Sequence, residues 1–155
     1  MKGAILEKGK EDYTKLNLFL PIVKKVATSY NWLLTDIDSD YYSKSLYEKD
    51  YELLSGEEFV KLMEKGNYAF AWGVFSAIAP ELAIEKIIEG GLPYANGYTG
   101  FWENPIMIQN PLASMEMTLW DGKSVLLISR NEKITEDFLH YYGLSEDLEK
   151  YNSKK

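Results

Sequence analysis

The sequence predicts an α+β fold in which helices pack against a mixed or mainly antiparallel sheet of about five to six strands. Apolar residues alternate with a period of two in several short segments and recur at helical spacing in the segments between them. In addition, Asp121-Gly122 separates two apolar runs, which is typical of a type I′ turn between antiparallel strands. The 155 residues fit one domain, 1–155, because no Gly-, Ser- or Pro-rich linker divides them.

The first third of the chain predicts two strands with a helix between them. Residues 3–8 and 32–37 are expected as the strands. The helix is expected to be capped by Asn17, because Pro21 is tolerated only in the first turn of a helix. Residues 39–54 are polar and rich in tyrosine, and they show no clean period.

The middle of the chain contains the clearest local signals. Ser55 is followed by Glu58, the spacing of a capping box, and Gly66 is placed to end the helix that it starts. Residues 67–79 form the most strand-like segment, and we expect it to be central in the sheet. Pro80 is expected to open a helix that reaches Glu89.

The last third combines a long loop, a hairpin and a final helix. Residues 92–104 are expected to be a loop without secondary structure of its own. The other expected elements are strands at 106–108, 114–120 and 123–129 and a helix at 134–142. The tail, residues 152–155, is expected to be frayed.

The charge of the chain excludes two classes of partner. There are 17 basic and 24 acidic residues, a net charge of −7, whereas nucleic acid and anionic membranes attract the opposite sign. A basic protein partner fits this charge, although many bacterial cytosolic proteins are acidic for solubility alone. The chain has no cysteine, its N-terminus does not resemble a signal peptide, and its longest apolar stretch is far too short for a membrane span. We therefore expect a cytoplasmic protein.

Three alternating carboxylates form the most suggestive chemical motif. Asp36, Asp38 and Asp40 follow a predicted strand and could converge on a hard cation. A calcium loop is not expected, because tyrosines (Tyr41 and Tyr47) stand where it needs Gly and Glu. A small metal-dependent hydrolase using Asp36 and Asp38 remains the alternative function, but we expect no specific metal site here.

The usual catalytic and cofactor motifs are missing from the sequence. His140 is the only histidine, and no Gly-x-Ser-x-Gly element surrounds any serine. Gly90-Gly91 follows a predicted helix instead of preceding one, and the segment from Gly97 to Gly100 lacks the lysine of a phosphate-binding loop. We expect no cofactor and no catalytic residues, which favours a non-enzymatic role.

The aromatic residues provide the best candidates for binding. Two groups do not fit a core pattern: Tyr41, Tyr42, Tyr47 and Tyr51, and the loop residues Tyr94, Tyr98, Phe101 and Trp102. Tyrosine and tryptophan are common anchors of protein interfaces, and we predict that the loop group binds a partner. The alternative is that these rings fold back to cover the sheet, and the sequence leaves both interpretations open.

The C-terminal third resembles a group of small bacterial proteins. The resemblance rests on Pro111-Leu112-Ala113-Ser114, Glu116 to Lys123, Leu127-Ile128-Ser129-Arg130 and the closing stretch from Ser145 to Asn152. Some of these proteins are similar to immunity proteins, which neutralise the toxins of neighbouring bacteria. The resemblance covers about a third of the chain and implies a non-enzymatic role. The missing catalytic motifs, the acidic charge and the clustered aromatic rings lead to the hypothesis of a binding protein, with an immunity-type inhibitor of a basic toxin as its most specific form. A homodimer with a structural role is a further hypothesis.

Overall fold

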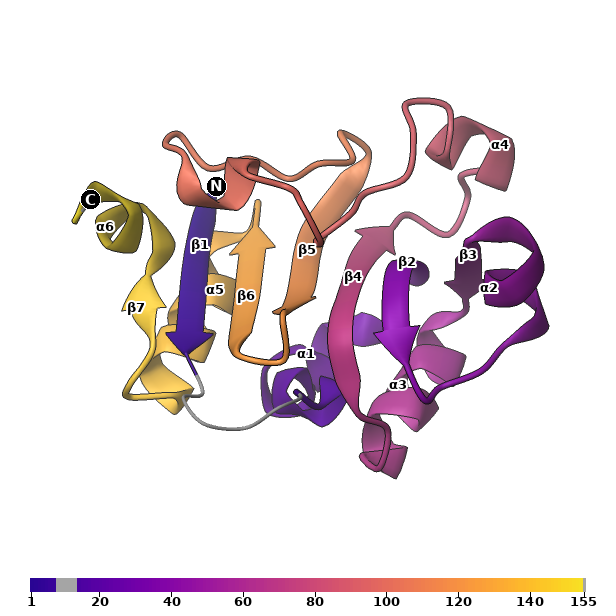
Figure 1. Ribbon diagram of the computed structural model, residues 1–155, viewed down its shortest axis with the longest axis horizontal. Helices are drawn as coiled ribbons and strands as arrows, with labels where there is room; N and C mark the ends of the chain where they lie inside the picture. The colour runs from indigo at the N-terminus through magenta and orange to yellow at the C-terminus, as the bar shows by residue number, and fades with distance from the viewer. Residues whose placement is uncertain (8–13, 155) are drawn as a thin grey trace.

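A seven-stranded antiparallel sheet organises the protein, as Figure 1 shows for the computed structural model, which describes residues 1–7 and 14–154. The strand order is β3-β2-β4-β5-β6-β1-β7. The strands are β1 (Lys2–Glu7), β2 (Asn31–Ser39), β3 (Tyr51–Leu54), β4 (Phe70–Ile78), β5 (Ala113–Trp120), β6 (Ser124–Ser129) and β7 (Glu146–Asp147). Every neighbouring pair is antiparallel, so the predicted α+β class is confirmed, with a larger sheet than the expected five to six strands.

The helices and an extended segment cover the two faces of the sheet in different ways. The helical elements are η1 (Leu16–Phe19), α1 (Leu20–Ala27), α2 (Lys44–Lys49), α3 (Gly56–Lys65), α4 (Ile84–Ile87), η2 (Gly100–Trp102), α5 (Glu132–Tyr141) and α6 (Leu148–Ser153). One face, here the helical face, packs against α1, α3 and α5. The opposite face, here the loop face, is covered by α6 and by the segment that joins β4 to β5, which crosses in front of the strands in Figure 1.

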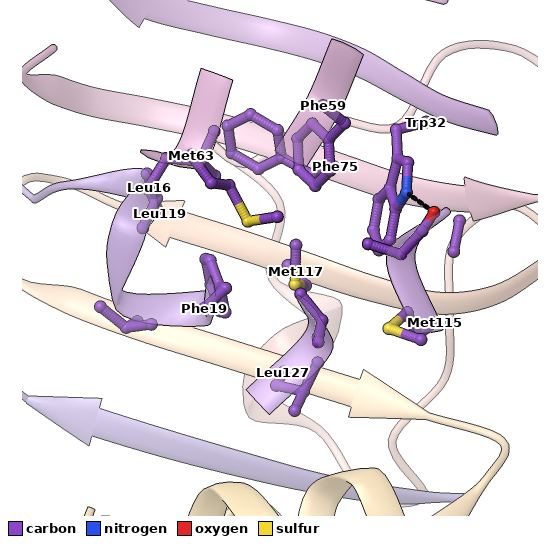
Figure 2. Close-up of a cluster of buried hydrophobic side chains, with 14 of the residues drawn as sticks. Leu16, Phe19, Trp32, Phe59, Met63, Phe75, Met115, Met117, Leu119 and Leu127 are labelled. Carbon is purple, nitrogen blue, oxygen red and sulfur yellow. Dashed lines mark hydrogen bonds between the residues drawn. The ribbon is translucent and has the colours of Figure 1, made fainter. Parts of the chain in front are cut away.

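The core of the helical face is almost purely apolar (Figure 2). Trp32 of β2 stacks on Phe59 of α3 with ring centroids 4.4 Å apart, and its Nε1–H donates to the carbonyl oxygen of Ala27 at 3.0 Å. Met115 and Met117 rise from β5 into the same cluster because alternate residues of a strand point to one face. The indole is therefore both packed and hydrogen-bonded, which is how a buried tryptophan is normally stabilised.

Helix α3 begins and ends where the sequence predicts. The Ser55 hydroxyl accepts from the Glu58 amide, and the Glu58 carboxylate accepts from the Ser55 amide, which completes the capping box. Gly66 ends the helix in the left-handed conformation, with φ 62°. At the other end, Gly56 lies so close to the end of α1 that a Cβ there would be 2.5 Å from the backbone oxygen of Ala27.

The segment predicted to be central lies inside the sheet. β4 pairs with β2 on one side and β5 on the other. Phe75 and Ala77 face the helical core, whereas Val74 and Ile78 belong to the loop face. Trp72 is only half-buried on the loop face, where it meets Trp120 edge-on.

Several predicted elements differ from the structure. The stretch 106–108 is not a strand, and the helix expected over 80–89 is reduced to α4, because Leu82 closes a turn onto the carbonyl of Ala79 before it. The stretch 39–54, whose sequence shows no clean period, contains α2 and β3, which are too short to produce a clear periodicity. β7 has two residues and escaped prediction for the same reason.

The two ends of the described chain also correct the predictions. Asn17 does not cap a helix, because it lies within η1, and α1 follows directly with Pro21 near its start. The tail expected to be frayed includes Asn152, which is buried in α6 and donates to the carbonyl oxygen of Phe101 at 2.9 Å. Residue 8 of the first predicted strand lies outside the described residues.

Candidate functional site

The loop face carries a series of open hollows along the segment between β4 and β5. One of about 310 Å³ lies between α4 and the stretch from Gln109 to Leu112. A second, of about 210 Å³, lies between residues 90–94 and Tyr98 and Gln109. A third, of about 280 Å³, lies between residues 92–94 and the α2 region. The first two share Gly90, Gly91 and Gln109, and the last two share Leu92, Pro93 and Tyr94.

Asp36 attaches this segment to the sheet. The pairing of β2 with β4 shifts register between Thr35 and Asp38, and Asp36 adopts a left-handed conformation with φ 50°. Its Oδ2 accepts from the amides of Ala95 at 2.8 Å and Asn96 at 2.9 Å. The irregularity in β2 thus turns a carboxylate out of the ladder to hold the loop, which is a common role of β-bulges near functional surfaces.

The four predicted binding residues lie together in a row of aromatic rings. Tyr94 meets Tyr98 with centroids 5.3 Å apart, Tyr98 meets Phe101 at 4.7 Å, and Phe101 meets Trp102 at 6.0 Å. The row continues from Trp102 to Trp120 of β5 at 5.2 Å. Interplanar angles of 69° to 84° make these contacts edge-to-face, the arrangement that aromatic pairs favour, so the rings pack the loop against the sheet.

These four residues differ in what they offer to a partner. Phe101 is buried, and Tyr98 and Trp102 are half-buried against the loop face, so most of this ring surface covers the sheet. Tyr94 is 46% exposed and is the only one of the four that presents much of its ring to the outside. That the group binds a partner stays a prediction, and Tyr94 is the residue of the four whose ring a partner could reach most easily.

Tyr94 forms one wall of an acidic cleft, defined here as the third hollow, whose lining residues are Asp36, Ile37, Leu46, Asp50, Leu92, Pro93 and Tyr94. Asp50 ends α2 with φ 64° and is exposed. Among residues 1–7 and 14–154, neither Asp36 nor Asp50 is ion-paired. The cleft therefore combines two carboxylates without a basic partner and an accessible aromatic ring.

The second aromatic group predicted from the sequence divides into two pairs. Tyr41 packs edge-on against Tyr68, and its hydroxyl donates to Glu52 at 2.6 Å, while Tyr51 is half-buried in β3. Tyr42, which precedes α2, is 71% exposed, and Tyr47, which lies within α2, is 80% exposed. Tyr47 lies on the same short helix as Leu46, which lines the cleft.

The three alternating aspartates do not converge. Asp36 is bonded to the loop amides, whereas the Asp40 carboxylate accepts from the Ala69 amide at 2.9 Å on a different segment. Asp38 is exposed. In the described part of the chain, no three His, Cys, Asp or Glu side chains are grouped so that they could hold a metal ion. The geometry thus gives no support to the alternative of a metal-dependent hydrolase.

Glu116 is a feature of the site that sequence reasoning missed. It lies in the middle of β5 on the loop face and is 1% exposed. Its Oε1 accepts from the Gln109 amide at 3.1 Å, and its Oε2 has no hydrogen-bond partner. Burial raises the pKa of this carboxyl to about 7, against the smaller opposing effect of the Gln109 amide. A single acidic residue among Met115, Met117 and Leu119 was the available signal.

Comparison with known proteins adds no relative. The chain matches no protein-family model, and neither a curated protein nor a solved structure is detectably similar to it. Among the described residues, no helix is both long enough and apolar enough to cross a membrane. The remaining candidate residue, His140, is exposed near the end of α5, on the helical side of the sheet and away from the acidic cleft.

Proposed function

We propose that this chain is a non-enzymatic binding protein that receives a basic segment of a protein partner in the acidic cleft. In its most specific form, the proposal is an immunity-type inhibitor of a basic bacterial toxin: the C-terminal resemblance suggests the non-enzymatic role, and the acidic charge of the chain suggests the basic partner. The observation that carries the proposal is the combination of Asp36, Asp50 and the exposed ring of Tyr94 around one hollow of about 280 Å³.

Charge supports a basic partner. The cleft presents two carboxylates that have no basic partner among the described residues, within a chain of net charge −7. Complementary charge accelerates the encounter of two proteins and discriminates against partners of the same sign. A lysine or arginine side chain placed between Asp36 and Asp50 would supply the missing positive charge.

The rings supply the contact area that charge alone lacks. Tyr94 is fixed by Tyr98 on one side and exposed on the other, so binding would order few additional rotamers. A cation next to the face of an exposed tyrosine gains about 0.5–1 kcal/mol, and interface tyrosines commonly act as anchors. The exposed rings of Tyr42 and Tyr47 would extend the same contact.

The first experiment selects ligands for the cleft from a displayed random peptide library. The wild-type protein serves as bait, and binders of the Tyr94→Ala, Asp50→Asn double variant are removed beforehand. We expect the surviving peptides to be rich in lysine and arginine, and to lose at least about tenfold in affinity for Tyr94→Ala alone. Tyr141→Ala, which removes an exposed tyrosine from α5, is the matched control and should bind normally.

The second experiment tests the inhibitor role. Cells expressing basic toxin domains, one at a time, are given the wild-type protein or the double variant. Growth rescue by the wild type that the double variant fails to provide supports an immunity function. Selection of neutral or acidic peptides in the first experiment, or peptides that bind Tyr94→Ala as tightly as wild type, would contradict the acidic cleft as the binding site.

A further inference from the structure

A strip of buried polar side chains crosses the loop face beneath the covering segment. Ser76 of β4 lies directly opposite Glu116 of β5, and Thr35 of β2 lies diagonally from Ser76, opposite Val74. All three are buried, and the Ser76 Oγ, Thr35 Oγ1 and Glu116 Oε2 atoms have no hydrogen-bond partner. Buried polar groups without partners are uncommon and destabilising, so a cluster of them calls for a functional explanation.

Glu116 is connected to the acidic cleft by a single intermediate residue. Its Oε1 accepts from the Gln109 backbone amide. The Gln109 side chain in turn holds the backbone of Tyr94 at two points, accepting from its amide at 3.0 Å and donating to its carbonyl oxygen at 2.8 Å. The buried carboxyl therefore helps to position the cleft wall that Tyr94 forms.

Among residues 1–7 and 14–154, Glu116 forms no ion pair that would balance a negative charge. Ser76 faces it from β4, Ile128 from β6, and Gln109 from the covering segment. Tyr98 is a titratable neighbour, and its pKa is raised by burial and then by Glu116, Tyr94 and Glu103. Arg130 follows the end of the neighbouring strand β6. Its guanidinium donates to the carbonyl oxygens of Ala113 and Pro111 and not to Glu116.

We propose that Glu116 is a proton-dependent anchor: with its proton bound it holds the segment from Tyr94 to Gln109 closed on the sheet, and without it the segment opens more readily. The protonated carboxyl has an O–H to offer toward the unpartnered hydroxyl of Ser76 while it still accepts from Gln109. The ionised carboxylate has no balancing charge and requires water, which reaches it when the segment lifts.

The range of the effect follows from the difference between the closed and open states. Burial raises the pKa of Glu116 from its ordinary 4.5 to about 7 in the closed state, and solvent exposure would restore the ordinary value in the open state. Opening therefore becomes more favourable as the pH rises from about 4.5 to about 7, by tenfold per pH unit at most, and levels off above that. The total change is on the order of 100-fold.

Amide hydrogen exchange measures this opening directly and needs no partner. Exchange rates of Tyr94, Ala95, Asn96 and Gln109 are followed from pH 5 to pH 8 and divided at each pH by the rate of an unprotected amide. We expect their opening constants to rise across this range in the wild type and to stay constant in Glu116→Gln. Glu81→Gln, which removes an exposed carboxylate near α4, is the matched control and should behave as the wild type.

Three outcomes would overturn the proposal: opening independent of pH in the wild type, pH dependence that persists in Glu116→Gln, or opening constants of the segment equal to those of the β5 and β6 amides at every pH. The last would show that the segment opens only when the whole protein unfolds. If Glu116→Gln does not fold, carbon-13 NMR of the wild type replaces it. The Glu116 carboxyl signal and the ring signals of Tyr94 and Tyr98 should then titrate with one midpoint, and separate midpoints contradict the anchor.

The consequence for binding rests on the proposed function and is tested apart from it. A peptide that binds the acidic cleft should bind more weakly at pH 7.5 than at pH 5.5 in the wild type, to the extent that the open segment is populated, because opening displaces Tyr94. If no peptide binds but the pH dependence of amide exchange is as expected, the cleft is not a binding site and Glu116 is still a proton-dependent anchor. Normal peptide binding with pH-independent exchange would refute the anchor but retain the cleft.

Discussion

The two faces of the sheet are covered by different means and serve different purposes. The helical face packs α1, α3 and α5 onto side chains such as Trp32, Phe75 and Met117, all buried and nearly all apolar. The loop face buries Thr35, Ser76 and Glu116 beneath a segment with little regular structure. The comparison teaches that both faces bury an apolar core, and that the core of the loop face also encloses polar groups, of which Glu116 accepts from the covering segment.

The largest expected effect belongs to the helical face. Trp32→Ala should lower the free energy of unfolding by about 3–5 kcal/mol, because it removes a fully buried indole together with its hydrogen bond to Ala27. Trp72→Ala, on the loop face, should cost less than half as much, because that ring is half-buried. Urea denaturation of both variants gives the comparison, and equal losses would remove the distinction between the faces.

The next largest effect is a pH-dependent gain in the free energy of unfolding, caused by a substitution on the loop face. Because burial raises the pKa of Glu116 from 4.5 to about 7, the native state binds this proton more tightly than the unfolded state does. Its stabilisation is complete below about pH 4.5, declines as the pH rises, and is lost once the pH passes about 7. The free energy of unfolding of Glu116→Gln should therefore exceed that of the wild type by about 3 kcal/mol at pH 8 and differ little from it at pH 4.

Urea denaturation at the two pH values checks this expectation. Glu57→Gln, which removes an exposed carboxylate from α3 on the helical face, serves as its control. A gain of the same size at pH 4 and pH 8 would mean that the substitution acts through packing and not through the proton.

Gly56→Ala should produce a smaller loss on the helical face. An added Cβ would meet the backbone oxygen of Ala27 and the Cα of Thr28 at 2.5 Å, and backbone atoms yield less easily than the end of a side chain. We expect a loss of about 1–3 kcal/mol, the usual cost of overpacking. Gly90→Ala, where no atom lies within 4 Å of the added Cβ, is the control for the change from glycine to alanine. Equal effects at the two positions would show that the close approach of α1 and α3 is unimportant.

The smallest effect should come from Thr35→Val, which replaces a buried hydroxyl that has no hydrogen-bond partner with a methyl group of similar size. The substitutions on the helical face are expected to lower the free energy of unfolding. For Thr35→Val we expect this free energy to stay unchanged or to rise by up to about 1 kcal/mol. Thermal unfolding of the variant measures the difference. A loss of more than about 1 kcal/mol would indicate that the hydroxyl is satisfied in solution and that the polar strip is less costly than inferred.

Sequence reasoning worked where a structural element has a strong local signal. The capping box of Ser55 and Glu58 starts α3 as predicted, and Asp121 and Gly122 both have the positive φ of a type I′ turn. It failed where an element depends on distant partners. β3 is a strand because Tyr51 to Leu54 pair with β2, and the four residues alone show no alternation.

The candidate site was predictable only in part for a similar reason. The composition of the loop identified Tyr94, Tyr98, Phe101 and Trp102, and the structure does bring these rings together. The sequence could not show that Tyr94 alone would remain widely exposed, nor that it would meet Asp36 and Asp50 in one cleft, because those contacts join segments separated by more than forty residues. Glu116 was overlooked because its burial depends on the segment that folds over it.

The position of β1 has a consequence for the order in which the protein is assembled. This first strand pairs only with β6 and β7, so that Lys2 lies opposite Ser129 and Ala4 opposite Asp147. During translation, β2, β3 and β4 can form their antiparallel ladder early, but β1 must wait until its partners have left the ribosome. Contacts of such long sequence separation slow folding. Until they form, both the apolar residues of β1 and the edge of β6 remain open to the wrong partners, which makes the nascent chain most vulnerable to aggregation at its oldest end.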